Sequence, residues 1–92
     1  MDKLIELIKQ NKDCFFNSVS NRMYTSVANK DKHAMVLAAL SMCNYRLLEE
    51  LFLDRWYHKP LEGVIYCMEC DFELKMKFIK AFGDVKDTNH EM

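Results

Sequence analysis

The amino-acid sequence predicts an all-α protein, and three observations support that fold class. Half of its 92 residues are hydrophobic, 29% are charged and the net charge is −1, which is typical of a chain that folds around a packed core. Only two glycines and one proline are present, whereas β-sandwiches and small barrels use such residues at their many turns. Apolar residues also recur at spacings of three and four, which is the period of an amphipathic helix.

We expect residues 1–92 to form a single domain. Within it, residues 1–29 are expected to form an N-terminal cap or a degenerate unit. Residues 2–10 carry apolar side chains on one helical stripe, and residues 11–13 interrupt it. Residues 14–29 predict a second helix, the least regular one, because polar residues are mixed with its apolar stripe. The two stripes are Leu4, Ile5, Leu7 and Ile8, then Phe15, Phe16, Val19, Met23 and Val27.

A helical hairpin is predicted over residues 31–57. Residues 33–42 are almost all apolar and small, so we expect a helix that is buried on several sides, with Asp31 as its N-cap. Asn44 suits the N-cap of a second helix over residues 45–56, whose apolar side chains face inward at helical spacing.

A second helical hairpin is predicted over residues 59–83. Pro60 suits the first position of its first helix, and Asp71 suits the N-cap of its second helix. Gly83 is placed to end that second helix. The polar residues 84–92 predict a frayed tail.

A C-terminal β-hairpin is the minor alternative for part of this region. Residues 72–78 alternate strictly between apolar and charged side chains, as a half-buried strand does, and would pair with residues 63–68. Glu, Leu, Lys and Met are good helix formers, however, and residues 69–71 contain no glycine for a tight turn. The helix is therefore the preferred prediction.

The two predicted hairpins resemble each other in sequence. Residues 44–47 match residues 71–74 at an offset of 27, and residues 34–38 match residues 60–64 at an offset of 26. A single hairpin of this kind cannot bury its apolar face alone, so we expect the units to stack.

This pattern resembles the ankyrin-repeat family. Residues 59–65 look like the start of one unit, residues 82–85 like its end, and residues 33–51 like the preceding unit. The resemblance implies a stack of helical hairpins that binds other proteins without catalysis. The offset is shorter than the family's repeat of about 33 residues, and the inner turns lack glycine. A small irregular helical bundle is the alternative.

The loop between the two hairpins is the candidate partner-binding site. It reads Arg55-Trp56-Tyr57-His58 and contains the side-chain types that contribute most of the binding energy at interfaces. The alternative role for Trp56 is to close the core. Four methionines could line an adaptable groove or fill the core, and core filling is the commoner role of methionine. These residues are Met35, Met42, Met68 and Met76.

The four cysteines are expected to be reduced thiols in a helical core. Cys67 and Cys70 have the spacing of a zinc knuckle, but no second pair accompanies them. A zinc site would require stacked units to bring Cys43 and His33 to this pair, so no metal and no cofactor is expected. A redox role for Cys67 and Cys70 would need a βαβ surround, which the sequence does not indicate.

We expect no enzymatic activity, because no catalytic Ser, His or Cys arrangement has a recognisable local context and two glycines do not make a phosphate loop. The balanced charge argues against nucleic-acid binding, for which Lys75, Lys77 and Lys80 would be the candidates. No apolar run approaches the roughly 20 residues that span a bilayer.

The sequence therefore predicts a small protein–protein interaction module in the cytoplasm. Its size and composition suggest a phage or viral accessory protein that inhibits a host factor in the host cytoplasm, and an adaptor or regulatory subunit of a cellular complex is the alternative. A short stack leaves an apolar end face, so we expect a homodimer or a tight hetero-complex. The expected contact residues are Leu4, Ile5, Leu7, Ile8, Phe78, Ile79 and Phe82.

Overall fold

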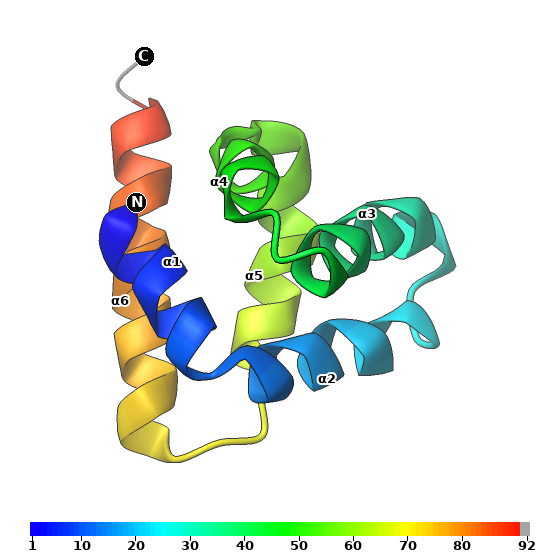
Figure 1. Ribbon diagram of the computed structural model, residues 1–92, viewed down its shortest axis with the longest axis horizontal. Coiled ribbons are helices and arrows are strands. Elements are labelled where there is room, and N and C mark those ends of the chain that lie inside the picture. Colours follow the sequence, from blue (N-terminus) through cyan, green and yellow to red (C-terminus); the bar gives the residue numbers. More distant parts are fainter. Residues whose placement is uncertain (91–92) are drawn as a thin grey trace.

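The protein is described here from a computed structural model, which covers residues 1–90 and the side chains of residues 1–87. Within residues 1–90 the chain forms six α-helices and two short 3-10 turns and contains no strand, so the all-α prediction is confirmed (Figure 1). The helices are α1 (Asp2–Gln10), α2 (Lys12–Met23), α3 (Lys30–Ser41), α4 (Tyr45–Leu53), α5 (His58–Tyr66) and α6 (Phe72–His90).

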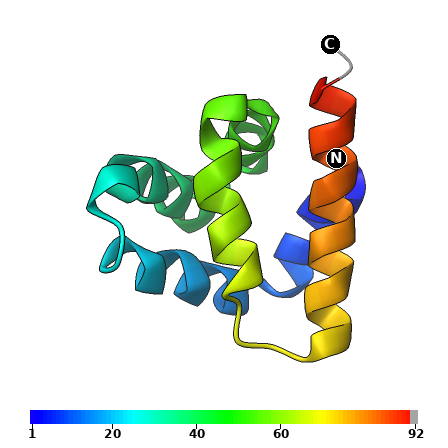
Figure 2. The same ribbon diagram turned by 180° about the vertical axis from the view of Figure 1, so that it is seen from behind.

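The helices form two groups that meet along α5. Helix α5 runs between α6 on one side and the α2–α3 pair on the other, as both ribbon views show (Figure 2). Helix α1 crosses from α2 to α6 and packs against both, and α4 packs against α3 and α6. The N-terminal helix thereby covers the C-terminal one, which places α1 and α6 face to face.

The turn between α3 and α4 ends at the helix N-cap that the sequence predicts, Asn44. The Asn44 side chain accepts a hydrogen bond from the Leu47 backbone N–H at 3.1 Å, which caps α4. The preceding Cys43 has a φ of 52°, a left-handed conformation that glycine usually supplies at a helix C-terminus. The Asn44 N–H then donates to the Ala39 carbonyl at 2.9 Å and closes the end of α3.

Several predicted helix boundaries are wrong, and α4 is the first case, because it ends at Leu53 instead of near residue 56. Helix α2 ends at Met23 instead of running to residue 29, and a 3-10 turn occupies Val27–Asn29. Asp31 does not cap α3, because the helix already begins at Lys30 and places Asp31 in its first turn. Pro60 is the third residue of α5, since α5 begins at His58.

The largest correction concerns α6. Gly83 does not end this helix, which continues to His90, so residues 84–90 are helical and only 91–92 of the predicted tail lie outside the described residues. Gly83 has no positive φ, and Val85 beyond it is 3% exposed in the core. Burial of Val85 favours continuation of the helix, because a chain end at Gly83 would leave that side chain in water.

The alternative β-hairpin is also wrong, since residues 72–78 form the first two turns of α6. A strand would bury every second residue of this segment, yet Phe72 is 77% exposed and Met76 is 45% exposed. The buried residues of α6 are Phe78, Ala81, Phe82 and Val85, which follow the helical spacing of three and four.

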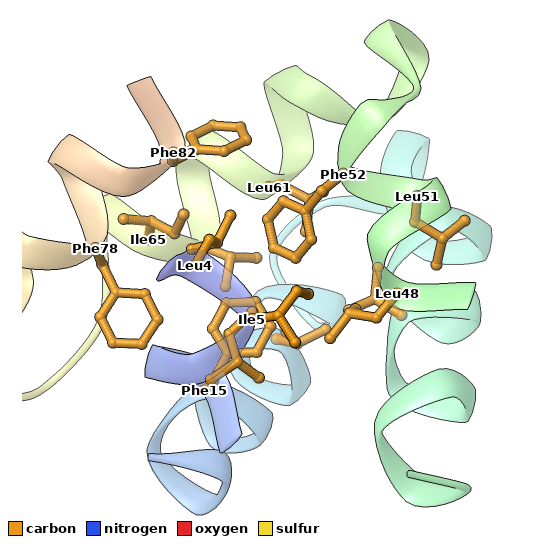
Figure 3. Packing of buried hydrophobic residues seen from close by; sticks show 14 of the residues in the cluster. Leu4, Ile5, Phe15, Leu48, Leu51, Phe52, Leu61, Ile65, Phe78 and Phe82 are labelled. Carbon is orange, nitrogen blue, oxygen red and sulfur yellow. The ribbon is translucent and has the colours of Figure 1, made fainter. Parts of the chain in front are cut away.

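The core is centred on phenylalanine rings from three helices. Phe15 of α2 stacks on Phe78 of α6 with ring centroids 6.1 Å apart, and it also contacts Phe52 of α4 at 6.1 Å. Phe52 in turn meets the edge of Phe82 at 5.7 Å. Figure 3 shows these rings together with Leu4 and other aliphatic side chains in one interior. The core therefore joins elements that are far apart in sequence.

Helix α3 is less buried than its composition predicts. Val36, Ala39 and Leu40 are buried, but Ala34 and Ala38 are exposed and Met35 is 44% exposed. The cause is its position at the edge of the molecule, where its neighbours α2 and α4 leave one face open to solvent.

The two predicted hairpins are present as α3–α4 and α5–α6, but their connections differ, spanning residues 42–44 in one and residues 67–71 in the other. The structure gives no evidence for ankyrin-like units, and that resemblance stays a prediction.

Candidate partner-binding surface

The connection between α4 and α5 is a short, well-anchored 3-10 turn, Arg55–Tyr57. The Asp54 side chain accepts a hydrogen bond from the Trp56 N–H at 2.9 Å, and the Asp54 carbonyl accepts one from the Tyr57 N–H at 2.9 Å. An aspartate that bonds the backbone two residues on fixes a turn locally. The loop that the sequence singled out therefore has a defined backbone conformation.

Trp56 projects from this turn into solvent and is 69% exposed. The alternative that Trp56 closes the core is therefore wrong. The Lys32 ammonium of α3 lies 3.9 Å from the centroid of the indole ring, which is a cation–π contact. This contact joins the loop to the first turn of α3 and restrains the exposed ring.

The four residues of the predicted binding loop divide into two pairs. Arg55 and Trp56 are exposed. Tyr57 is partly buried against the core. The His58 ring nitrogen Nε2 lies 2.8 Å from the Phe52 carbonyl, and the ring meets Phe82 edge-on at 5.7 Å. Tyr57 and His58 thus contribute mainly to the fold, whereas Arg55 and Trp56 are accessible to another molecule. We call Lys32, Arg55 and Trp56 the Trp56 surface.

Several other apolar side chains are exposed that sequence reasoning placed in the core or did not consider. Met68 fills the core, as expected for methionine, but Met35 lies on the open face of α3, one helical turn after Lys32. The remaining exposed large apolar side chains are Tyr24, Val27, Met42, Leu53, Tyr66, Phe72 and Met76. Periodicity assigns these residues to apolar stripes but does not reveal which stripe lacks a neighbour.

The residues expected at an oligomer contact lie mostly inside the chain. Five of the seven are buried, and Leu7 and Ile79 are partly buried against the same core. The reason is that α1 packs on α6, so the two predicted end faces cover each other. The expected exposed contact face is therefore absent from this structure, and the oligomeric state stays a prediction. The five are Leu4, Ile5, Ile8, Phe78 and Phe82.

The side chains considered for a metal site are not brought together. His33 is buried beside Arg22, Cys43 accepts a hydrogen bond from the Lys12 ammonium at 3.0 Å, and Cys67 contacts Arg22 with an Nη1–Sγ distance of 3.6 Å. In the part of the chain that the structure describes, no three His, Cys, Asp or Glu side chains are grouped as a metal site requires.

The four cysteines are free thiols with two kinds of environment. The Lys12 ammonium lowers the pKa of exposed Cys43 below its usual 9.0, first by its hydrogen bond and then by its charge. Burial, followed by the nearby Cys70, raises the pKa of Cys14, whose Sγ donates to the Glu69 carbonyl at 3.5 Å. Cys67 lies at the C-terminal end of α5, whereas a redox pair usually places its nucleophile at a helix N-terminus.

His33 is the most deeply buried ionisable side chain of the core region and is 1% exposed. Neither ring nitrogen has a hydrogen-bond partner of normal geometry within the described residues. Burial, and then the charge of Arg22, lower the pKa of His33 from 6.5, while the Pro60 carbonyl acts in the opposite direction. The side chain is therefore a neutral imidazole at neutral pH.

A polar hollow of about 260 Å³ lies where α2 meets the end of α5. Its serine, Ser18, donates to the Val64 carbonyl at 2.7 Å, so the hydroxyl is committed to joining α2 and α5. The lining residues are Cys14, Asn17, Ser18, Asn21, Cys67 and Glu69. This set contains no histidine that could serve as a general base for the thiols of Cys14 and Cys67.

Comparison of the chain with models of protein families, with curated proteins and with solved structures found no match. Across the described residues, no helix is both long and apolar enough to cross a membrane. The Trp56 surface is therefore the feature from which a function can be inferred.

Proposed function

We propose that the protein is a small non-catalytic module that binds another protein through the Trp56 surface. The observation that carries this proposal is the exposed Trp56, which is fixed in place although it closes no part of the core. A large aromatic ring in water loses the free energy that burial would release, at about 25 cal/mol per Å² of apolar area. A partner that covers the ring recovers this free energy.

The fixed geometry of the surface also favours binding. Side chains that become ordered only on binding lose about 0.5–1.5 kcal/mol each, and this loss is smaller where the side chain is already held. Lys32 restrains the Trp56 ring, and the Asp54 turn fixes the backbone of Arg55 and Trp56. Trp and Arg are the residues most often found at the energetic centres of interfaces.

The kind of partner follows from the size of the chain and is the less specific part of the proposal. A chain of 92 residues that presents an exposed tryptophan on an anchored turn is suited to bind and block a single protein. Inhibition of a host factor by a phage or viral accessory protein is the role that we favour, and an adaptor within a cellular complex is the second candidate.

A capture experiment with matched variants tests the proposal. Wild type, Trp56→Ala and Arg55→Ala are immobilised and exposed to cell lysate, and the retained proteins are identified. Tyr66→Ala serves as control, because Tyr66 is an exposed aromatic residue at the opposite end of α5. We expect one protein to be retained by wild type and by Tyr66→Ala but lost with Trp56→Ala and weakened with Arg55→Ala.

Circular dichroism of each variant separates binding from folding. Trp56→Ala should keep its helical signal, because its side chain leaves no cavity in the core. Equal retention by Trp56→Ala and wild type would contradict the proposal, and so would loss of helicity in that variant.

A further inference from the structure

A second hollow lies between α1 and α6, beside the core, and has a volume of about 280 Å³. Its walls carry two kinds of side chain, the apolar Leu7 and Ala81 and a set of three lysines with one aspartate. The complete lining is Lys3, Leu7, Lys77, Lys80, Ala81 and Asp84, and we call it the α1–α6 hollow. None of these residues belongs to the Trp56 surface.

The helical spacing explains how the lysines converge. Lys3 and Leu7 are four residues apart on α1, and Lys77 and Lys80 are three apart on α6, so each pair lies on one face of its helix. The packing of α1 against α6 then brings the two faces together. Lys75, the third lysine considered for nucleic acid, is directed elsewhere and donates to the Tyr66 carbonyl at 2.9 Å.

The charge at this hollow is unbalanced. Among the described side chains, the ion pair within 4.0 Å is Lys86 with Glu62, so no carboxylate of residues 1–87 lies at that distance from Lys3, Lys77 or Lys80. Like charges held on adjacent helix faces repel one another, and an anionic ligand relieves that repulsion. The site therefore favours a ligand that brings negative charge to the rim and an apolar group to the floor.

The dimensions narrow the choice of ligand. A volume of about 280 Å³ is below the 300–1,000 Å³ of a typical cofactor or drug-sized ligand site. Proteins that bind single-stranded nucleic acid stack its bases on aromatic side chains, and none of the residues that line this hollow is aromatic. A short peptide segment with an apolar side chain between acidic residues supplies both chemistries at this scale.

We propose that the α1–α6 hollow binds an acidic peptide segment of a partner protein. The apolar side chain of the peptide contacts Leu7 and Ala81, and the carboxylates that flank it in the peptide pair with Lys3, Lys77 and Lys80. Like the proposed function, this inference concerns a protein partner, but it assigns binding to a surface other than the Trp56 surface. Each of the two proposals can therefore fail without the other.

The test is a binding titration with a fluorescein-labelled synthetic peptide in which two leucines are flanked on both sides by glutamates. We expect the anisotropy to rise on addition of wild type at low salt and the affinity to fall as salt is added. The amide NMR signals of Leu7 and Ala81 should shift, whereas that of Trp56 should not. A peptide with lysines in place of the glutamates should not bind.

Charge-matched variants locate the binding. Lys77→Glu with Lys80→Glu should weaken binding by about tenfold or more, because two attractive contacts become repulsive. Lys30→Glu with Lys59→Glu changes the net charge equally at two exposed lysines outside the hollow and should change the affinity by less than about twofold. Trp56→Ala should bind the peptide as wild type does. The glutamine pair Lys77→Gln and Lys80→Gln repeats the test without introduced acids if the glutamate pair does not fold.

Three outcomes would overturn the inference. The first is no binding of the acidic peptide by folded wild type at low salt. The second is an equal loss of affinity in both lysine pairs, which would indicate only net charge. The third is tighter binding of a single-stranded DNA oligonucleotide than of the peptide, with the same dependence on Lys77 and Lys80, which would assign the hollow to nucleic acid.

Discussion

At the scale of single residues, His33 is a polar side chain held in the core, where it is 1% exposed. Among the described residues, neither ring nitrogen has a hydrogen-bond partner of normal geometry, and the Pro60 carbonyl and the positive charge of Arg22 lie nearby. A buried polar group without a partner costs about 1–3 kcal/mol, and protonation of this ring would add a charge next to Arg22. The sequence analysis considered His33 as a possible zinc ligand, although it expected no metal, because the residue type alone does not reveal that the surroundings of the ring are apolar.

The first prediction concerns pH. The pKa of His33 is lowered in the folded protein, so the unfolded chain takes up a proton first as the pH falls below about 6.5. The contribution of His33 to the free energy of unfolding is therefore fully present above about pH 6.5, and it is lost as the pH falls toward the pKa of His33 in the folded protein. We expect His33→Leu to reduce this acid loss and to match or exceed wild-type stability at pH 7. Urea unfolding at several pH values measures both effects, and a steeper acid loss in His33→Leu would contradict the account.

The second prediction concerns Cys43. Its Sγ accepts a hydrogen bond from the Lys12 ammonium at 3.0 Å, which lowers the pKa of the thiol. The alkylation rate of Cys43 by iodoacetamide should therefore rise at lower pH than that of Cys14, whose pKa is raised by burial.

Lys12→Met should shift the Cys43 profile to higher pH, whereas Lys30→Met, a change at an exposed lysine, should leave it in place. Mass spectrometry of the labelled peptides gives the rates. An unchanged Cys43 profile in Lys12→Met would show that exposure alone governs its reactivity.

At the scale of elements, the sequence predicted helix faces better than helix ends. The stripe of α1 and the Asn44 cap of α4 are local properties, since each depends on residues within one turn, and both are confirmed. The end of α6 is not local, because burial of Val85 extends the helix beyond Gly83. The sequence left two roles open for Trp56, an exposed binding residue and a residue that closes the core, because a lone aromatic residue in a loop carries no period.

The third prediction follows from the continuous α6. Gly83 is in the interior of a helix, has no positive φ, and an added Cβ would meet nothing within 4 Å. Gly83→Ala should raise the free energy of unfolding by about 0.5–1 kcal/mol, because alanine loses less backbone entropy in a helix. Gly63→Ala should gain less, since its Cβ would approach Arg22 Nη2 at 3.0 Å. If Gly83→Ala is destabilising in thermal unfolding, α6 ends near residue 83 instead.

At the scale of the whole molecule, a small core links all the helices, and its aromatic centre is the point of greatest sensitivity. Phe15 is fully buried and contacts the rings of Phe52 and Phe78, so it joins α2 to α4 and α6. A chain of 92 residues has little stability to spare, because small domains bury a smaller fraction of their surface.

The fourth prediction tests this core. Phe15→Ala should lower the free energy of unfolding by about 3–5 kcal/mol and leave a large part of the chain unfolded. Phe72→Ala is the matched control, because Phe72 is 77% exposed, and should change stability by less than about 0.5 kcal/mol. Similar losses in the two variants, measured by urea unfolding, would place the aromatic centre elsewhere.

The arrangement of the helices also shows why the residues expected at an oligomer contact are buried within one chain. Apolar residues of α1 and α6 are accounted for within one chain, because the first helix packs on the last. Sequence periodicity finds two apolar faces but cannot tell whether they meet each other or a second molecule. The surfaces that we propose for partners are the Trp56 surface and the α1–α6 hollow.

The most direct measurement of the central claim is quenching of the fluorescence of Trp56, the single tryptophan of the chain, by acrylamide. In the free protein the account predicts strong quenching, because the ring is 69% exposed. The same quenching is then measured in the complex with the protein that wild type retains, and any tryptophan of that partner is first replaced by phenylalanine. In this complex, quenching of Trp56 should fall to the level of a buried residue. Weak quenching in the free protein, or unchanged quenching in the complex, would contradict the assignment of Trp56 as the partner-binding anchor.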